Sequence, residues 1–235
     1  MRLCMFRPVG HPLERGWVGR VEDDHVVQLA AQTVQAFFTG GGRAREHAVY
    51  ALENVDLLAP VLHPPAIRVF ESATSFEFAN PAAIMGPNSE VAHRTADDWL
   101  HLDLRPRLAA VVGERGEIGG FTILADWRAP ELSPPKDRDF ALGLGPFVVT
   151  PDEAPAPHEV VVQLFDEEVL RASFGVFDWH AACEFAAADT MLRSGDILAG
   201  PAPGIVEGVE IATVVHVGVP GIGVLSQSVH PPVEA

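Results

Sequence analysis

Two arginines stand at a spacing that would bring their side chains to one face of a β-strand, and an aspartate follows a later apolar segment. Arg105 and Arg107 are two residues apart in the segment Asp103–Gly113, and Asp126 comes directly after a second apolar segment, Gly119–Ala125. Alternate residues of a strand point to the same side, so both guanidiniums should face the same space. A guanidinium has only donors and keeps its proton. Such a pair therefore binds carboxylates, enolates or other polarised oxygens rather than a metal cation.

Further charged residues could belong to the same set. Asp126 either pairs with an arginine or acts as an acid or base. Lys136 lies in the proline-rich segment Ser133–Asp137, where its amine either reaches the site as another cation or is solvated at the surface. Glu71 and Glu77 each either face the site, where a carboxylate could move a proton, or belong to a solvated face. Buried arginines without acidic partners are costly, so some of these carboxylates must pair with them.

The remaining candidate features are weaker. Trp127 follows Asp126 directly, so its ring could border the site, although packing is the commoner role of a tryptophan in an apolar strand. The sequence lacks the glycine-rich loops of nucleotide binding, the serine-hydrolase elbow and the His-Glu-x-x-His zinc motif. The ten histidines are scattered singly, which is typical of surface or packing residues.

The composition narrows the functions that these residues can serve. The chain has 235 residues, with 16 Lys and Arg against 32 Asp and Glu, so no basic surplus is available for binding nucleic acid. Cys4 and Cys183 are too few for a disulfide framework or a cysteine-based zinc site. No apolar run of about 18 residues would span a membrane, and residues 1–7 lack the apolar core of a signal peptide. We therefore expect a cytoplasmic protein with a small-molecule substrate and neither nucleic acid nor membrane as a partner.

The elements that would position the charged residues fall into two regions, 1–63 and 64–235, which meet at the proline-rich segment Pro60–Pro65. The first region should be a small α/β domain with these elements: strands at Met1–Arg7, Trp17–Val21 and Val26–Leu29, and helices at Val27–Phe38 and Ala44–Asn54. The second has apolar runs that predict strands: Ile67–Phe70, Leu108–Val112, Phe121–Leu124, Phe147–Val149, Val160–Phe165 and Val214–Val217. Its one expected helix is Trp179–Met191, with Asp178 as N-cap. The fold class should be mostly β, of the α+β type.

Five segments follow one another in an informative order. They are Asp103–Gly113, Gly119–Asp126, Lys136–Asp139 leading to Leu144–Pro146, Gly195–Asp196 before Pro203–Gly204, and Gly221–Leu225. In order and spacing they resemble the fumarylacetoacetate hydrolase family. That family has a Glu-x-Glu-Leu strand, a segment ending in Asn-Asp, a Lys-x-x-Asp before Leu-Gly-Pro, a Gly-Asp-x-x-x-Thr-Gly-Thr-Pro turn and a terminal Gly-Ile-Gly-x-Leu. The resemblance covers residues 66–230.

The resemblance implies a distorted β-roll that forms a homodimer and carries a small N-terminal domain. In the family, three carboxylates hold a divalent cation such as Mg²⁺ or Mn²⁺, which polarises a 1,3-dicarbonyl or 2-oxo acid. Aligned without a gap, this chain has Arg105 and Arg107 at the two glutamate ligands and keeps only Asp126, while Lys136 falls on the family lysine near metal and substrate. The family's catalytic His-Glu loop is also missing, between Phe70 and Phe76. We therefore expect neither a metal nor another cofactor.

These observations support three hypotheses. In the first, the chain is a metal-independent enzyme of specialised (secondary) metabolism that acts on an enolisable or anionic carbonyl by cyclisation, isomerisation, lyase chemistry or decarboxylation. Arg105 and Arg107 would bind and polarise the substrate, helped by Lys136. Asp126 or Glu71 would move the proton, and Trp127 and Glu77 would contact the substrate. In the second, the chain is a non-catalytic binding or scaffold protein. In the third, it is a metal-dependent C–C hydrolase with ligands rearranged onto Asp126 with Glu71 or Glu77.

Overall fold

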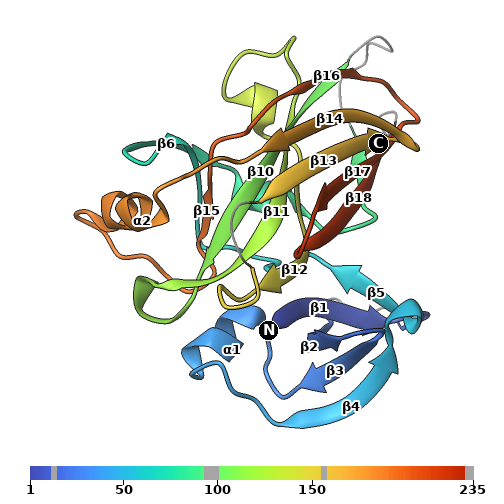
Figure 1. Cartoon of the computed structure of the whole chain (residues 1–235), viewed down its shortest axis with the longest axis vertical. Coiled ribbons are helices and arrows are strands. Elements are labelled where there is room, and N and C mark those ends of the chain that lie inside the picture. The colour runs from blue at the N-terminus through green and yellow to red at the C-terminus, as the bar shows by residue number, and fades with distance from the viewer. Residues whose placement is uncertain (12–14, 93–100, 155–157, 231–235) are drawn as a thin grey trace.

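The computed structural model describes residues 1–11, 15–92, 101–154 and 158–230. These residues form two β-sheets and two short α-helices, which are joined by turns and loops (Figure 1). The mostly β class predicted from the sequence is confirmed. The longer helix, α2 (Trp179–Ala187), has nine residues. Within the described ranges, no helix is long and apolar enough to cross a membrane.

The N-terminal region is a meander of strands with one helix, drawn in blue in Figure 1. Its elements are β1 (Arg2–Pro8), β2 (Trp17–Glu22), β3 (His25–Leu29), α1 (Val34–Thr39), β4 (Glu46–Ala51), a 3-10 turn (Leu52–Asn54) and β5 (Val55–Leu58). The Thr33 side chain caps α1 by accepting a hydrogen bond from the backbone N–H of Ala36. Strand β1 joins the N-terminal strands to the larger sheet, because its Arg2 and Leu3 pair with Val149 and Val148 of β12 (Leu142–Val149).

The helix predicted at Ala44–Asn54 is wrong. This segment forms β4, which pairs antiparallel with β3, so that Val49 lies opposite Val27. The Tyr50 ring packs against the ring of Phe6, with 5.4 Å between their centroids. Pairing and aromatic packing thus fix as a strand a segment whose composition also suits a helix. The helix predicted at Val27–Phe38 forms only from Val34 onwards, because its first residues belong to β3.

The larger sheet positions the charged residues. It has 13 strands, and its main path runs β4-β3-β2-β1-β12-β11-β10-β15-β6-β7. The strands not yet bounded are β6 (Ile67–Ser72), β7 (Ser75–Ala79), β8 (Ile84–Met85), β10 (Leu102–Val112), β11 (Ile118–Arg128), β15 (Ile197–Ala199) and β16 (Val206–Val209). Short 3-10 turns lie at Pro81–Ala83, Glu114–Gly116 and Lys136–Arg138. The long antiparallel pair β10–β11 forms the centre of this sheet.

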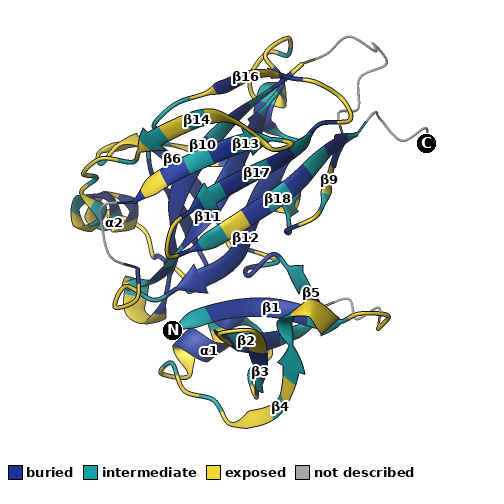
Figure 2. Ribbon diagram, turned by 45° about the vertical axis from the view of Figure 1, so that its right-hand side comes forward, coloured by how far each residue is buried: buried dark blue, intermediate teal, exposed yellow. Residues whose placement is uncertain are grey.

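The smaller sheet packs against one face of the larger one. It has five strands in the order β14-β13-β17-β18-β9, namely β14 (Glu167–Ser173), β13 (Glu159–Leu164), β17 (Val214–Val219), β18 (Gly223–His230) and β9 (Glu90–Ala92). Helix α2 follows β14 and begins at its predicted N-cap, where the Asp178 side chain accepts a hydrogen bond from the backbone N–H of Ala181. Figure 2 shows buried residues along the central strands of both sheets, whereas β4 and β14 are largely exposed.

Alternation along β10 and β11 sends their side chains into two separate layers. Leu104, Leu108 and Trp127 belong to the core between the two sheets. Ala109 and Leu124 belong to a second core, formed where the larger sheet curls back on itself. By register, Arg105, Arg107 and Asp126 are on the same face as Ala109 and Leu124. The candidate site therefore lies in the second layer, away from the smaller sheet.

Candidate functional site

The sequence-predicted residues Arg107 and Asp126 meet in a fully buried ion pair. In the β10–β11 ladder, Arg107 lies opposite Leu124 and Arg105 lies opposite Asp126. Arg107 Nε donates to Asp126 Oδ2 at 3.0 Å, and the side chains of both residues are 0% exposed. The pair forms because alternation places both residues on one face, and because a buried guanidinium needs an anionic partner.

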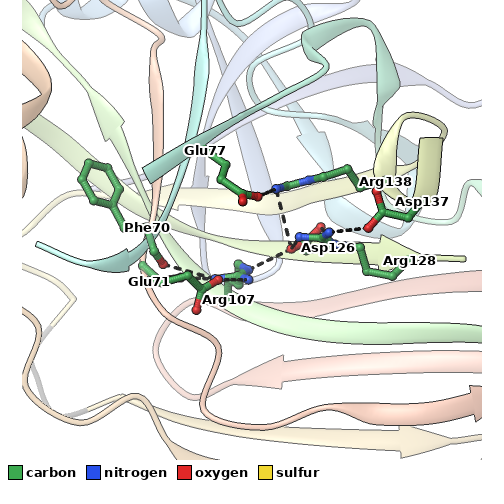
Figure 3. Close-up of polar contacts among 9 residues, drawn as sticks. Phe70, Glu71, Glu77, Arg107, Asp126, Arg128, Asp137 and Arg138 are labelled. Atoms are coloured by element: carbon green, nitrogen blue, oxygen red, sulfur yellow. Dashed lines mark hydrogen bonds and ion pairs between the residues drawn. The ribbon is translucent and has the colours of Figure 1, made fainter. Parts of the chain in front are cut away.

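Arg107 also ties three other segments to β10 (Figure 3). Its Nη1 donates to the backbone oxygens of Phe70, at 3.3 Å, and Gly200, at 3.0 Å. Its Nη2 donates to Glu71 Oε1 at 2.8 Å. Every nitrogen of this guanidinium has an acceptor, so Arg107 has no donor nitrogen left without a partner for a ligand. Glu71, which the sequence places near the site, remains 64% exposed at its rim.

Two arginines that sequence reasoning missed complete the environment of Asp126. Arg128 Nε donates to Asp126 Oδ1 at 3.1 Å, and Arg128 Nη1 donates to Asp137 Oδ2 at 2.8 Å. Arg138 Nη1 donates to Glu77 Oε2 at 2.6 Å, and its Nη2 lies 4.0 Å from Asp126 Oδ2. Figure 3 shows these guanidiniums converging on Asp126. The available signal was alternation, because Arg128 stands two residues after Asp126 on the same strand.

The pKa values of Arg128 and Arg138 are shifted in opposite directions. Burial acts to lower the pKa of Arg128, but Asp126 and Asp137 outweigh burial, and its pKa lies above the ordinary value. Burial lowers the pKa of Arg138 below the ordinary value, with Arg128 and Arg107 adding repulsion that Asp126 and Glu77 do not fully offset. The carboxylates around Arg128 therefore compensate for its burial, whereas those around Arg138 do not.

Arg105 differs from the other arginines of this face. It is partly buried, its Nε is shielded from solvent without a hydrogen-bond partner, and its guanidinium has no ion pair within the described ranges. Asp126, its neighbour across the ladder, is already bound to Arg107 and Arg128. Arg105 is therefore a donor-rich group beside the cluster that the described residues leave unused.

The other predicted residues are not drawn into this cluster, apart from Glu77 on Arg138. Lys136 is 72% exposed and forms an ion pair with Asp139 at the surface. Trp127 is fully buried in the layer between the two sheets, where its Nε1 donates to Gln227 Oε1 at 2.8 Å. Its ring therefore faces away from Asp126.

Comparison with known proteins places the fold. The sequence matches no family model and no curated protein. The structure is similar to that of maleylpyruvate hydrolase from Sphingobium sp. SYK-6, solved with a manganese(II) ion and pyruvate, with a TM-score of 0.82 over 99% of this chain and 100% of that one, at 19% identity. It is equally similar to fumarylacetoacetate hydrolase from Exiguobacterium antarcticum, with a TM-score of 0.81 over 98% and 99%, at 21% identity. The chain has the fumarylacetoacetate hydrolase fold.

The chain is also similar to a 2-keto-3-deoxy-D-arabinonate dehydratase that was solved with magnesium and 2,5-dioxopentanoate. The TM-score is 0.77 over 100% of both chains, at 19% identity. These structural similarities confirm the fold that was predicted from the resemblance of the sequence motifs. At these identities it is the fold that is shared, and the chemistry of this chain must be argued from its own side chains.

The residues that the sequence resemblance aligns with the family's metal ligands do not suit a cation. Arg105 and Arg107 have no acceptor atoms, and both carboxylate oxygens of Asp126 already accept hydrogen bonds from guanidiniums. Glu71 and Glu77 are bound to arginines as well. In the part of the chain that the structure describes, no group of three or more His, Cys, Asp or Glu is placed to hold a metal.

Proposed function

We propose that this chain is an enzyme of the fumarylacetoacetate hydrolase fold that binds the carboxylate or enolisable carbonyl of a small substrate through Arg105, without a metal ion at Asp126. The observation that carries the proposal is the Arg105 guanidinium, whose Nε is buried and unpartnered beside the Arg107–Asp126 ion pair. A buried donor without a partner costs free energy that an incoming oxyanion would recover. A guanidinium can also hold a carboxylate through two parallel hydrogen bonds.

The proposal assigns different roles to the two arginines that replace the family's glutamates. Arg107 and Asp126 are fully buried and mutually bound, so they support the wall of the site and do not contact substrate. Arg105 is the binding group. Its charge would stabilise negative charge that develops on a carbonyl oxygen, which is the electrostatic contribution that a cation makes in a metal-dependent enzyme.

Glu71 is the proton carrier in this scheme. One of its oxygens accepts from Arg107, and the side chain is 64% exposed, so it can exchange protons with water. In an enolisation, a proton moves from the substrate carbon next to the carbonyl to Glu71, and the electron pair moves to the carbonyl oxygen near Arg105. Reprotonation at another atom gives a tautomer, and loss of carbon dioxide from a β-keto acid passes through the same enolate. The proposed reactions are therefore tautomerisation and decarboxylation.

A panel of oxaloacetate, acylpyruvates and β-keto acids, assayed with and without EDTA, tests the proposal. Turnover should persist in EDTA, and Arg105→Gln should lower kcat/KM by about 100-fold or more, since charge-assisted stabilisation of a developing oxyanion is worth roughly 3 kcal/mol. Arg115→Gln is the matched control, because that arginine is 85% exposed on a turn outside the site. Turnover that is abolished by EDTA and restored by Mn²⁺ would refute the metal-independent scheme.

A non-catalytic role is the second candidate, and the burial of the central ion pair favours it. Arg107 and Asp126 fill the family's cation position with their own side chains, and neither is exposed to solvent. Under this alternative, Arg105 binds a small acid without converting it. Calorimetry with pyruvate would then show binding that Arg105→Gln removes, while no substrate of the panel is turned over.

A further inference from the structure

A cavity lies on the other face of strand β10 from the cluster at Asp126. It has a volume of about 400 Å³ and lies where the chain between β14 and α2 passes over the middle of β10 and the end of β15. Leu108 contributes the β10 side of the wall, and its neighbour Arg107 faces the opposite layer. Gly200, just after β15, also lines the cavity, and its backbone N–H donates a hydrogen bond to the backbone oxygen of Leu108. The cavity is thus separated from the proposed substrate site by the sheet itself.

Aromatic rings form the wall opposite the sheet. Phe174, Phe177 and Trp179 all line the cavity and all remain partly exposed, unlike the aromatic residues of the core. The rings of Phe177 and Trp179 meet edge to face, with 4.7 Å between centroids, and Trp179 also contacts Phe121 at 5.4 Å. These contacts fix the ring planes before any ligand binds, so the wall is preorganised for a flat apolar molecule.

His158 is the polar group of this cavity. The residue is only 7% exposed and lines the cavity, with its ring centroid 6.1 Å from that of Phe121. Within the described part of the chain, no hydrogen bond or ion pair joins a ring nitrogen of His158 to another residue. Burial lowers the pKa of His158, so the ring is neutral at pH 7, with one nitrogen that donates and one that accepts. The polar atoms of this largely buried ring are therefore available to a ligand in the cavity.

We propose that this cavity binds an uncharged aromatic molecule of one or two rings, whose hydroxyl group forms a hydrogen bond with His158. The volume is at the lower end of that of small-molecule sites, which limits the ligand to about this size. The rings of Phe177 and Trp179 provide stacking and edge contacts for it. Among the described residues that line the cavity there is no arginine or lysine, so none of them would favour an anion over a neutral compound.

Isothermal titration calorimetry with 2-naphthol and naphthalene tests the proposal. 2-Naphthol should bind with one molecule per chain and more tightly than naphthalene, which lacks the hydroxyl. His158→Phe should weaken 2-naphthol binding about two- to tenfold, the range of one neutral hydrogen bond, and leave naphthalene binding unchanged. His158→Gln keeps a donor and an acceptor and should retain most of the affinity. The matched control is His180→Phe, at a histidine that is 86% exposed.

A second variant keeps the proposal testable if His158→Phe does not fold. A Cβ on Gly200 would lie 3.2 Å from the Trp179 ring, so Gly200→Ala should narrow the cavity and weaken both ligands. Failure of 2-naphthol to bind at its solubility limit, equal affinity for the two ligands, or full 2-naphthol affinity in both variants would each overturn the proposal. Arg105→Gln should bind 2-naphthol as the unmodified protein does, so this test stands apart from the proposed enzymatic function.

Discussion

Asp126→Asn is the substitution that most directly tests the account of the charged cluster. The Asp126 carboxylate is fully buried and accepts from Arg107 Nε at 3.0 Å and from Arg128 Nε at 3.1 Å, while Arg138 Nη2 lies 4.0 Å away. An amide keeps the shape of the side chain but removes the negative charge. Three guanidiniums would then repel one another, and the amide NH₂ would oppose one of their donors.

The expected loss follows from the two hydrogen bonds and the burial. A hydrogen bond to a charged group is worth about 1.5–3 kcal/mol, and breaking a buried ion pair by removing one partner costs about 3–5 kcal/mol. We therefore expect Asp126→Asn to lower the free energy of unfolding by roughly 3–5 kcal/mol and the melting temperature by roughly 6–20 °C for a chain of this size.

Urea denaturation followed by circular dichroism measures this loss. Glu71→Gln and Glu77→Gln are matched controls, because these carboxylates are 64% and 73% exposed and their ion pairs should contribute less than about 1 kcal/mol. Combining Asp126→Asn with Arg128→Gln should cost less than the sum of the single changes, because the second removes a charge that the first leaves unpaired. A loss below about 1 kcal/mol for Asp126→Asn, or strict additivity, would refute the reasoning.

Three further predictions concern other parts of the molecule. Burial raises the pKa of Cys4 to about 12 and raises the pKa of the half-buried Cys183 less. Iodoacetamide at pH 8 should therefore alkylate Cys183 first in the native protein, as mass spectrometry would show. Equal alkylation rates of the two thiols would contradict this. Because burial lowers the pKa of His158, the unfolded state binds more protons than the native state, and the free energy of unfolding should fall as the pH drops below about 6.5. This dependence of the free energy of unfolding on pH should be weaker in His158→Gln. Equal pH dependences of the two proteins in urea titrations would exclude this contribution. Trp127→Phe leaves Gln227 Oε1 without its donor and should cost about 1–3 kcal/mol in the same denaturation assay, whereas an unchanged midpoint would mean that water replaces the bond.

The strands and the fold were predictable where the pattern is local. Runs of β-branched residues marked the central strands, and the Asp178 cap marked α2. The segment Ala44–Asn54 was mispredicted because pairing with β3 and packing of Tyr50 decide its structure, and both depend on residues distant in sequence. Short strands such as β9 and β16 have too few residues to show a periodicity.

The candidate site was predictable in part. The family resemblance placed Asp126 beside the arginines, and the need for an acidic partner made an ion pair with Asp126 one of the expected arrangements. Alternation along the strand would have led to Arg128. Arg138 could not be found in this way, because its position depends on a turn that folds back over β11. The cavity at His158 has no sequence signal at all, since its wall is assembled from four separate segments.

The pairing of β1 with β12 bears on how the molecule assembles itself. Strand β1 is synthesised well before β12, yet its neighbours in the sheet include Val148 and Val149 of that strand. Strand β6 likewise precedes its partner β15, whose Ile197 lies opposite Ile67. The segments up to β15 must therefore be synthesised before the central sheet can close. Such non-local topology slows folding and leaves strand edges open in the meantime. We expect refolding on the slow side for a domain of this length, with a strong dependence of yield on protein concentration.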